Sequence, residues 1–182
     1  MATHPAVLGR FFEDYVVGDV YQHPLGRTIT ETDNTWITLL SMNTNQNHFN
    51  AHLAAQNPIT EGRVIVNSGF TVAVVLGISV LDMSQNAISN LAFTDIKMSH
   101  PVYEGDTIYA ESICTGLRKS ESRPYAGIVS MITRGLNQDG VEVISWKRSV
   151  MVATRESGIG QNYFPEAQNG PLQLPEEKGA TA

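Results

Sequence analysis

The sequence has one cysteine, few charged residues and no long apolar run, and each shortage narrows the range of possible proteins. Charged residues make up 16% of the 182 residues and hydrophobic ones 42%, so much of the chain must be buried or face another subunit. Cys114 has no second cysteine to pair with, which suits a reducing cytoplasm. Because it lies in the alternating segment IYAESICTGL, we interpret it as a small buried side chain in a strand, not a nucleophile.

Basic residues are scarce as well. There are 12 lysines and arginines against 18 acidic residues, the net charge is -6, and no basic run occurs, which argues against nucleic-acid binding. The longest apolar run, VAVVLGISVL, is shorter than the roughly 20 residues of a membrane helix. The opening MATHPAVLGRFFEDY lacks the basic and apolar regions of a secretory signal. We therefore expect a cytoplasmic protein that binds neither nucleic acid nor membranes.

The remaining pattern predicts an α+β fold. Residues 64–83 are apolar nearly all round, and their length favours a helix buried in a core. Gly105-Asp106 and Asp139-Gly140 indicate tight turns. Between and around these turns, four segments alternate with the period of strands: 87–102, 105–119, 125–140 and 141–154. One buried helix followed by long antiparallel strands predicts a sheet wrapped around that helix.

We expect a single domain at 9–154, a short extension at 1–8 and an extended or flexible tail at 155–182. The tail is rich in proline, glycine, glutamine and glutamate and shows no periodicity. No internal repeat is visible.

The first half of the domain predicts a strand at 20–30 and then two helices. Thr32 or Asp33 is suited to cap the first helix. The second, at 50–56, is short. Large apolar side chains line one face of the first helix: Trp36, Leu39 and Leu40.

The candidate chemistry lies between these two helices, in SMNTNQNHFNAHLAA. Five polar side chains, Asn43 to Asn47, precede His48, the one group of this loop that titrates near neutral pH. Taken alone, the pattern fits a capped loop with a hydrogen-bonded structural histidine equally well.

The same segment resembles the signature of the MaoC-like dehydratases and (R)-specific enoyl-CoA hydratases. In that family, Gly-Asp-x-Asn-Pro-aliphatic-His-x-Asp ends a helix and opens the active-site loop. Here Met42 stands at the glycine, Asn43 at the aspartate, Asn45 at the asparagine, His48 at the histidine and Asn50 at the second aspartate. The resemblance implies a hotdog fold.

Further stretches agree with this resemblance from about Gly9 to Val152. VNSGFTVAVVLG resembles the family's central helix, entered through a glycine, and HPVYEGDTI resembles its strand entry. The combination of MNTNQNHFNA, DNTW and RGLNQDG looks closest to the subgroup that handles branched dicarboxylic enoyl-CoAs, such as mesaconyl- or itaconyl-CoA.

The resemblance implies reversible addition of water across the α,β-double bond of an enoyl-CoA thioester. It implies proton transfer at His48 and a backbone N–H at the start of the central helix that holds the thioester oxygen. Gly69 matches that helix-entry glycine, although close backbone packing explains it equally well. Ser68 adds a hydroxyl for the substrate or only caps the helix.

Asn43 departs from the family pattern, because a carboxamide cannot act as a general base. Two routes remain open. In the favoured one, His48 serves as base and then acid, while Asn43 and Asn45 position the water. In the other, a carboxylate from elsewhere replaces the missing one, with Glu61 and then Asp33 as candidates; each also fits an ordinary role, as a solvated loop residue and a helix cap.

Two further groups bear on ligands. His52 follows His48 by one helical turn, but no carboxylate or cysteine of suitable spacing accompanies them, so we expect no metal. Arg118 and Arg123, with Lys119 between them, face either the phosphates of coenzyme A or only solvent in an exposed turn.

We expect no cofactor, since coenzyme A is part of the substrate, and a homodimer or higher homo-oligomer, because a sheet wrapped around one helix leaves an edge strand uncovered. Two other functions stay open. A hotdog acyl-CoA thioesterase shares the fold but usually needs an acidic residue on the central helix, and none occurs there before Asp82. A non-catalytic acyl-thioester-binding domain would fit Asn43.

Overall fold

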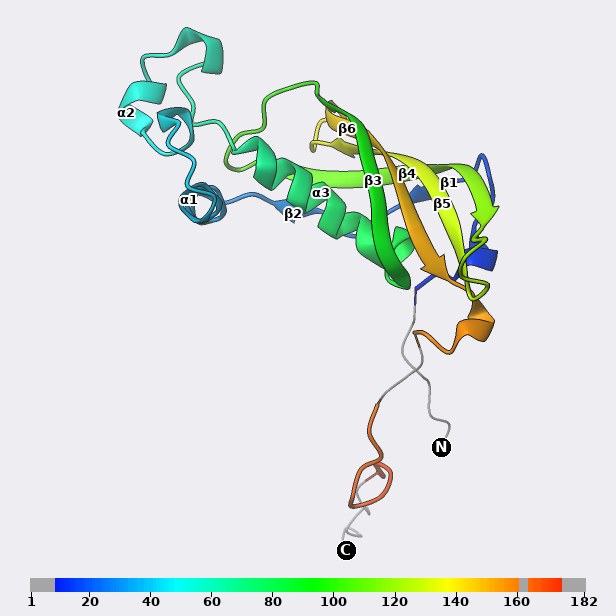
Figure 1. Ribbon diagram of the computed structural model, residues 1–182. Helices are drawn as coiled ribbons and strands as arrows, with labels where there is room; N and C mark the ends of the chain where they lie inside the picture. The colour runs from blue at the N-terminus through cyan, green and yellow to red at the C-terminus, as the bar shows by residue number, and fades with distance from the viewer. Residues whose placement is uncertain (1–8, 161–163, 175–182) are drawn as a thin grey trace, which may run out of the picture.

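The computed structural model describes residues 9–160 and 164–174, and its main body is a curved antiparallel sheet with one long helix against its inner face (Figure 1). This helix, α3, spans Ser68–Met83. Four long strands follow it: β3 (Ala87–Met98), β4 (Thr107–Lys119), β5 (Ala126–Leu136) and β6 (Glu142–Ala153). The predicted α+β architecture is confirmed.

The sheet order is β1-β4-β5-β6-β3, and β2 pairs with β4 beside β1. The strand expected at 20–30 is two short strands, β1 (Val20–Gln22) and β2 (Arg27–Thr28). Pro24 lies between them and has no N–H to donate to a strand ladder. Within the described residues β3 pairs with β6 alone, so β3 is an edge strand.

Close packing joins α3 to the sheet. Val75 and Ile78 are buried in one cluster with Ile144 and Trp146. Gly135 permits this approach, since a Cβ there would lie 2.6 Å from Cγ2 of Val75. Cys114 is buried in β4, as predicted, and burial raises the pKa of its thiol, which makes it a poor nucleophile.

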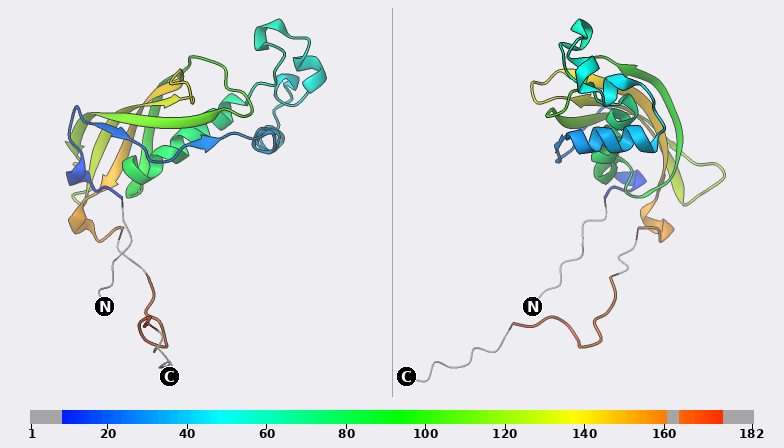
Figure 2. Two further views of the ribbon diagram at one scale, coloured as in Figure 1. Left: turned by 180° about the vertical axis from the view of Figure 1, so that it is seen from behind. Right: turned by 90° about the vertical axis from the view of Figure 1, so that its left-hand side faces the viewer.

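Residues 30–64, which we call the arm, project beyond one end of the sheet (Figure 2). The arm holds α1 (Glu31–Leu40), α2 (Ala51–Ala54) and the 3₁₀ turns Gln46–His48 and Pro58–Thr60. The cap of α1 is Thr30, where Thr32 or Asp33 was expected. Asp33 is its reciprocal partner: Thr30 Oγ1 accepts from the Asp33 N–H, and the Asp33 carboxylate accepts from the Thr30 N–H.

Helix α1 turns its apolar residues outward and its polar residues inward. Trp36 is 66% and Leu40 75% exposed, whereas Asn34 and Thr38 are fully buried. The predicted apolar face therefore exists but stays largely uncovered by the part of the chain that the structure describes.

Two 3₁₀ turns, Phe12–Asp14 and Arg155–Ser157, flank the sheet, and residues 164–174 contain no helix or strand. None of the helices in the described residues combines the length and apolar character needed to cross a membrane.

Candidate active site

The loop that carries His48 starts where α1 ends. Met42 N donates to Leu39 O and Asn43 N donates to Thr38 O, both at 3.0 Å, the two hydrogen bonds of a Schellman motif. This motif needs a left-handed residue, and Met42 has φ +54°. The conformation favours glycine, which explains physically why the resembled signature has glycine at this position.

Asn43 and Asn45 shape this loop with their side-chain oxygens. Asn43 Oδ1 accepts from Asn45 N at 2.9 Å, and Asn45 Oδ1 accepts from Asn47 N at 3.1 Å. Each of these oxygens already accepts one hydrogen bond, and the NH₂ group of each side chain can donate to a ligand but cannot accept a proton.

His48 is half-buried and held by the segment just before α3. Its Nδ1 lies 2.9 Å from the carbonyl oxygen of Ile65. A carbonyl only accepts hydrogen bonds, so Nδ1 carries the hydrogen and the neutral ring keeps its lone pair on Nε2. The ring is therefore oriented to take a proton at Nε2.

The start of α3 lies directly after this anchor. Asn67 caps the helix, and its Oδ1 accepts from Gly69 N at 2.9 Å. The Gly69 N–H, which was predicted to hold the thioester oxygen, is thus hydrogen-bonded to the Asn67 side chain in this structure. Ser68, the first helical residue, is exposed, and neither its N–H nor its hydroxyl has a partner among the described residues.

A cleft of about 170 Å³ opens beside Ser68. Ile65, whose carbonyl holds His48, belongs to its wall. The rest of the lining comes from the start of α3, the β3–β4 connection and β6: Val66, Ser68, Thr71, Met98, Ser99, His100, Pro101, Val102 and Val143. Ligand pockets usually measure roughly 300 Å³ or more, so this cleft has room for part of a ligand only.

Of the two carboxylates predicted as a substitute base, Asp33 is not suited to that role. Burial alone would raise the pKa of Asp33, but hydrogen bonds from Thr30 and Arg27 lower it, and a carboxylate of lowered pKa is a weak base. Glu61 is exposed in the turn that ends Pro58–Thr60.

Sequence reasoning missed two residues that the structure brings to His48. Asn34 is buried behind the loop, and its Nδ2 lies 3.0 Å from His48 O. Glu104 lies behind Asn34, with Oε1 3.2 Å from the same Nδ2. Both residues belong to segments quoted from the sequence above, DNTW and HPVYEGDTI. The signal that could have found them is a polar residue buried on the inner side of α1, and the sequence does not show which side of α1 is buried.

Arg118 and Arg123 are not brought to this site. Arg118 pairs with Ile128 at one end of β4, while Tyr109 pairs with Leu136 at the other end, next to the arm. Arg123 Nη1 contacts Met151 Sδ at 3.2 Å. Their predicted binding of coenzyme A phosphates therefore finds no support within one chain.

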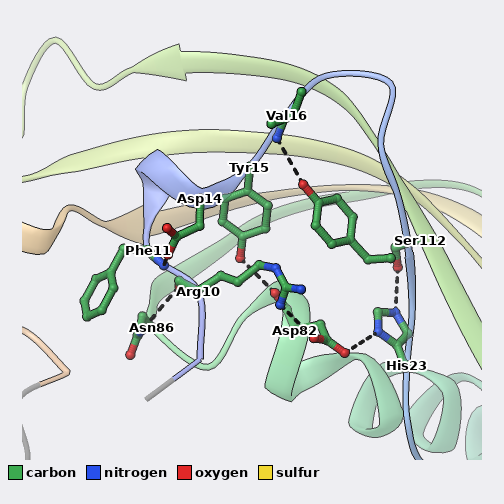
Figure 3. A network of polar contacts seen from close by, with 10 residues as sticks. Arg10, Phe11, Asp14, Tyr15, Val16, His23, Asp82, Asn86 and Ser112 are labelled. Atoms are coloured by element: carbon green, nitrogen blue, oxygen red, sulfur yellow. Dashed lines mark hydrogen bonds and ion pairs between the residues drawn. The ribbon is translucent and has the colours of Figure 1, made fainter. Parts of the chain in front are cut away.

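A second polar cluster lies at the C-terminal end of α3 (Figure 3). His23 Nδ1 is 3.0 Å from Asp82 Oδ2, and His23 Nε2 is 3.0 Å from Ser112 Oγ. Arg10 Nη1 donates to Asp82 Oδ1 at 2.8 Å. The sequence did not single out His23, which the fold brings together with Asp82 and Ser112.

This order of Ser, His and Asp is that of a nucleophilic triad, but its setting is structural. Ser112 is 1% exposed, and its Oγ is 2.8 Å from Thr133 Oγ1. No substrate can reach the hydroxyl. Burial lowers the pKa of His23, and the neighbouring Asp82 carboxylate opposes that shift.

The mesaconyl-CoA hydratase family model matches residues 3–169, nearly the whole chain. The chain belongs to the mesaconyl-CoA hydratase family.

Two curated relatives of this family member are identical to it at about a third of the aligned positions. The mesaconyl-CoA hydratase of Cereibacter sphaeroides is 34% identical over 154 residues, which cover 82% of this chain and 43% of that protein. The β-methylmalyl-CoA dehydratase of Chloroflexus aurantiacus is 32% identical over 152 residues, 81% of this chain and 41% of that protein. The chain thus spans less than half the length of these relatives.

Solved structures confirm the hotdog fold of this mesaconyl-CoA hydratase family member. A MaoC domain protein dehydratase from Chloroflexus aurantiacus superposes with a TM-score of 0.75 at 28% identity, over 95% of this chain and 47% of that one. A Mycobacterium tuberculosis protein with a double hotdog fold gives 0.73 at 20% identity, over 92% of this chain and 49% of that one. This second likeness concerns the fold alone.

Proposed function

We propose that this chain adds water reversibly across the α,β-double bond of an enoyl-CoA thioester, with His48 transferring the protons. The observation that supports this most is the hydrogen bond from His48 Nδ1 to Ile65 O, which leaves Nε2 as the proton acceptor. Ile65 N also donates to Asn47 O, so the His48 turn is hydrogen-bonded to the segment that leads into α3.

In the proposed reaction, the oxygen of water bonds to the β-carbon and one of its protons passes to Nε2 of His48. The π electrons of the double bond move to the α-carbon and the thioester oxygen. The α-carbon then takes a proton from Nε2–H, and the neutral histidine returns. Throughout the cycle Nδ1–H stays on Ile65 O, which orients the ring and stabilises its charged form.

The thioester oxygen gains negative charge during this reaction and needs N–H donors. The first turn of α3 supplies them, and the positive end of the helix dipole adds to their effect. Ser68 N–H is unpartnered within the described chain, whereas Gly69 N–H becomes available once Asn67 Oδ1 releases it. We assign the oxygen to these two amides.

Asn43 and Asn45 then act as donors. Their NH₂ groups are suited to hold the oxygen of the attacking water, and the proton goes to His48. This is the first of the two routes that the sequence left open. The hydrogen bonds that Thr30 and Arg27 donate to the Asp33 carboxylate support this route over one in which Asp33 is the base.

We place the substrate among the branched dicarboxylic enoyl-CoAs, with mesaconyl-CoA first. The family model and the Cereibacter sphaeroides relative carry that substrate in their names. A dicarboxylic substrate needs a cation for its free carboxylate. Arg63 is exposed two residues before Ile65, its guanidinium lies 3.9 Å from the centre of the Tyr103 ring, and it makes no ion pair with a described residue. We assign the carboxylate to Arg63.

The proposal includes a second copy of this chain. The relatives are more than twice as long as the matched segment, and a neighbour of similar fold has two hotdog units. In this chain an apolar groove on the arm, lined by Trp36, Ile37, Leu40 and Phe70, is open, as is the edge of β3. A partner at these surfaces would enlarge the cleft beside Ser68 for coenzyme A. We further propose that the reaction is cofactor-free and cytoplasmic, in keeping with the unpaired Cys114.

The test is a substrate panel of mesaconyl-, itaconyl- and crotonyl-CoA. Hydration removes the absorbance of the enoyl thioester without releasing free thiol. We expect this with mesaconyl-CoA, and we expect His48→Ala to lower kcat at least about 100-fold, the lower end of what a general base contributes. His52→Ala is the matched control, because His52 is exposed on the same arm and, among the described residues, its ring is hydrogen-bonded only to Gln56.

Other outcomes point elsewhere. Release of thiol would indicate a thioesterase, but the acidic residue of α3, Asp82, lies about 20 Å from Gly69 by helix rise and is held by Arg10 and His23. If neither the enoyl-thioester absorbance falls nor free thiol appears, a non-catalytic domain is favoured. Full activity in His48→Ala would rule out His48 as the base. Restoring a carboxylate with Asn43→Asp should preserve or increase activity.

A further inference from the structure

One side chain, Asn34, connects the His48 turn with the segment that leads into α3. It lies on the inner side of α1 and is fully buried. Its Oδ1 accepts from Asn67 N at 2.9 Å. Its Nδ2 lies near three acceptors: His48 O at 3.0 Å, Ile65 O at 3.3 Å and Glu104 Oε1 at 3.2 Å.

The chemistry of these partners fixes the orientation of the Asn34 amide. The Asn67 N–H only donates, so it must face the amide oxygen, while three oxygen acceptors must face the NH₂ group. The reverse orientation would set oxygen against three oxygens. Two hydrogens thus serve three acceptors, one of them a carboxylate, and a charged acceptor strengthens such a bond. The amide has a single satisfied arrangement.

Three of these four bonds end on residues that hold the groups of the proposed reaction. His48 O belongs to the proton-transferring residue itself. Ile65 O is the same atom that accepts from His48 Nδ1 and sets the tautomer of the ring. Asn67 is the cap that holds Gly69 N. The geometry of proton transfer and that of the oxyanion donors therefore share one anchor.

A second residue of α1 repeats the contact one turn later. Thr38, fully buried like Asn34, accepts through Oγ1 from Asn67 Nδ2 at 3.3 Å. The inner side of α1 thus holds the backbone and the side chain of Asn67 separately. Residues four apart on a helix lie above one another, so these two contacts form one row.

We infer that Asn34 is a positioning residue of the hydration site, which sets the His48 ring and the first turn of α3 at a fixed separation. This inference rests on the proposed function. It assigns α1 a catalytic task beyond covering the helix end. Because Asn34 touches no reacting atom, its loss should act through His48 and leave substrate affinity nearly unchanged.

The experiment combines kinetics with nitrogen NMR of the histidine rings. Asn34→Ala should lower kcat about 10- to 100-fold, the range typical of groups that orient a functional histidine, with KM within about threefold. In the wild type the His48 ring, assigned by its absence in His48→Gln, should carry its hydrogen on Nδ1. In Asn34→Ala that single tautomer should give way to a mixture.

The matched control is Asn86→Ala. Asn86 is also a buried asparagine whose Nδ2 donates to a backbone oxygen, that of Arg10, but it lies beyond the opposite end of α3. The Asn86→Ala substitution should lower thermal stability to a similar extent as Asn34→Ala. It should leave both kcat and the His48 spectrum unchanged. Equal losses of kcat in the two alanine variants would make the effect of Asn34 merely structural and overturn the inference.

A second variant keeps the test decisive if Asn34→Ala does not fold. Asn34→Asp keeps the acceptor for Asn67 N and removes the NH₂ donors, so kcat should fall as in the alanine variant. A kcat within threefold of wild type in a folded Asn34 variant, or an unchanged His48 tautomer, overturns the inference. A wild type that hydrates no member of the panel overturns the proposed function instead, and the NMR comparison still decides whether Asn34 orients His48.

Discussion

At the scale of single residues, the candidate site depends on backbone groups that side-chain patterns do not reveal. His48 could be selected from the sequence, because it is a titratable group in a polar loop. Its orientation could not, since it comes from the carbonyl oxygen of Ile65, 17 positions along the chain. Asn34 and Glu104 were missed for a related reason: a polar residue in an amphipathic segment is normally assigned to solvent, and here both contact the interior of the arm.

Met42 offers a prediction at this scale. It adopts φ +54° and is 87% exposed. The left-handed backbone is therefore strained, and little packing of the side chain offsets that strain. The left-handed region costs a non-glycine residue about 1–2 kcal/mol, and glycine loses about 0.5–1 kcal/mol in extra chain entropy. Met42→Gly should therefore raise the free energy of unfolding by about 0.5–1 kcal/mol, measured by urea denaturation.

The neighbouring Thr44 provides the control for Met42. Thr44 is exposed in the same loop and does not have a positive φ. Thr44→Gly gains no relief of strain and should lower the free energy of unfolding. A Met42→Gly protein that is less stable than wild type by as much as Thr44→Gly would show that the left-handed conformation carries no cost.

At the scale of elements, the sequence predicted most where its periodicity was long. All four long strands and the central helix were expected within a few residues, because alternation over a dozen positions leaves one interpretation. The orientation of α1 was not predictable in the same way. Trp36, Leu39 and Leu40 do line one face, but which face is buried depends on what packs against it, and that is decided by Asn34 and Thr38 on the other side.

The cluster around His23 gives a pH-dependent prediction for the C-terminal end of α3. His23 bridges Asp82 of α3 and Ser112 of β4, and burial lowers its pKa relative to the unfolded chain. As pH falls from 7 through the unfolded pKa near 6.5, the unfolded chain takes up a proton that the folded one resists. Folding should lose stability there, by at most about 1.4 kcal/mol per pH unit for one proton.

Urea denaturation at several pH values between 7 and 5 measures this loss. In His23→Gln the contribution of the buried ring disappears, so the decline of stability with falling pH should become shallower, even if the variant is less stable at pH 7. His100→Gln is the control, since His100 is exposed. An unchanged pH slope in His23→Gln would show that the buried ring of His23 does not cause the loss of stability between pH 7 and 5.

At the scale of the whole molecule, the described chain leaves an apolar groove on the arm and the edge of β3 uncovered. The arm stands away from the sheet (Figures 1 and 2). Its groove is lined by large apolar side chains, of which Trp36 and Leu40 are exposed. The sequence indicated some lost surface through its low charge content, but composition cannot say where that surface lies. Contiguous exposed apolar surface of this kind is typical of an interface.

We predict that the wild type is a dimer and that the groove on the arm belongs to the interface. A double variant, Trp36→Glu with Leu40→Glu, places two carboxylates in the groove, where burial against a partner would strip them of water at a cost of several kcal/mol. Sedimentation should then find a monomer at concentrations where the wild type is dimeric. Leu25→Glu is the control, because Leu25 is 61% exposed but lies outside the groove.

The same variants separate assembly from chemistry. Neither Trp36 nor Leu40 contacts His48 or the start of α3 through a hydrogen bond, so a folded monomer keeps the ring anchored on Ile65. If the partner completes the binding surface for coenzyme A, the monomeric double variant should have a raised KM. Activity per chain should rise with protein concentration in the wild type but not in the double variant. A double variant that stays dimeric with unchanged KM would place the interface elsewhere, at the free edge of β3.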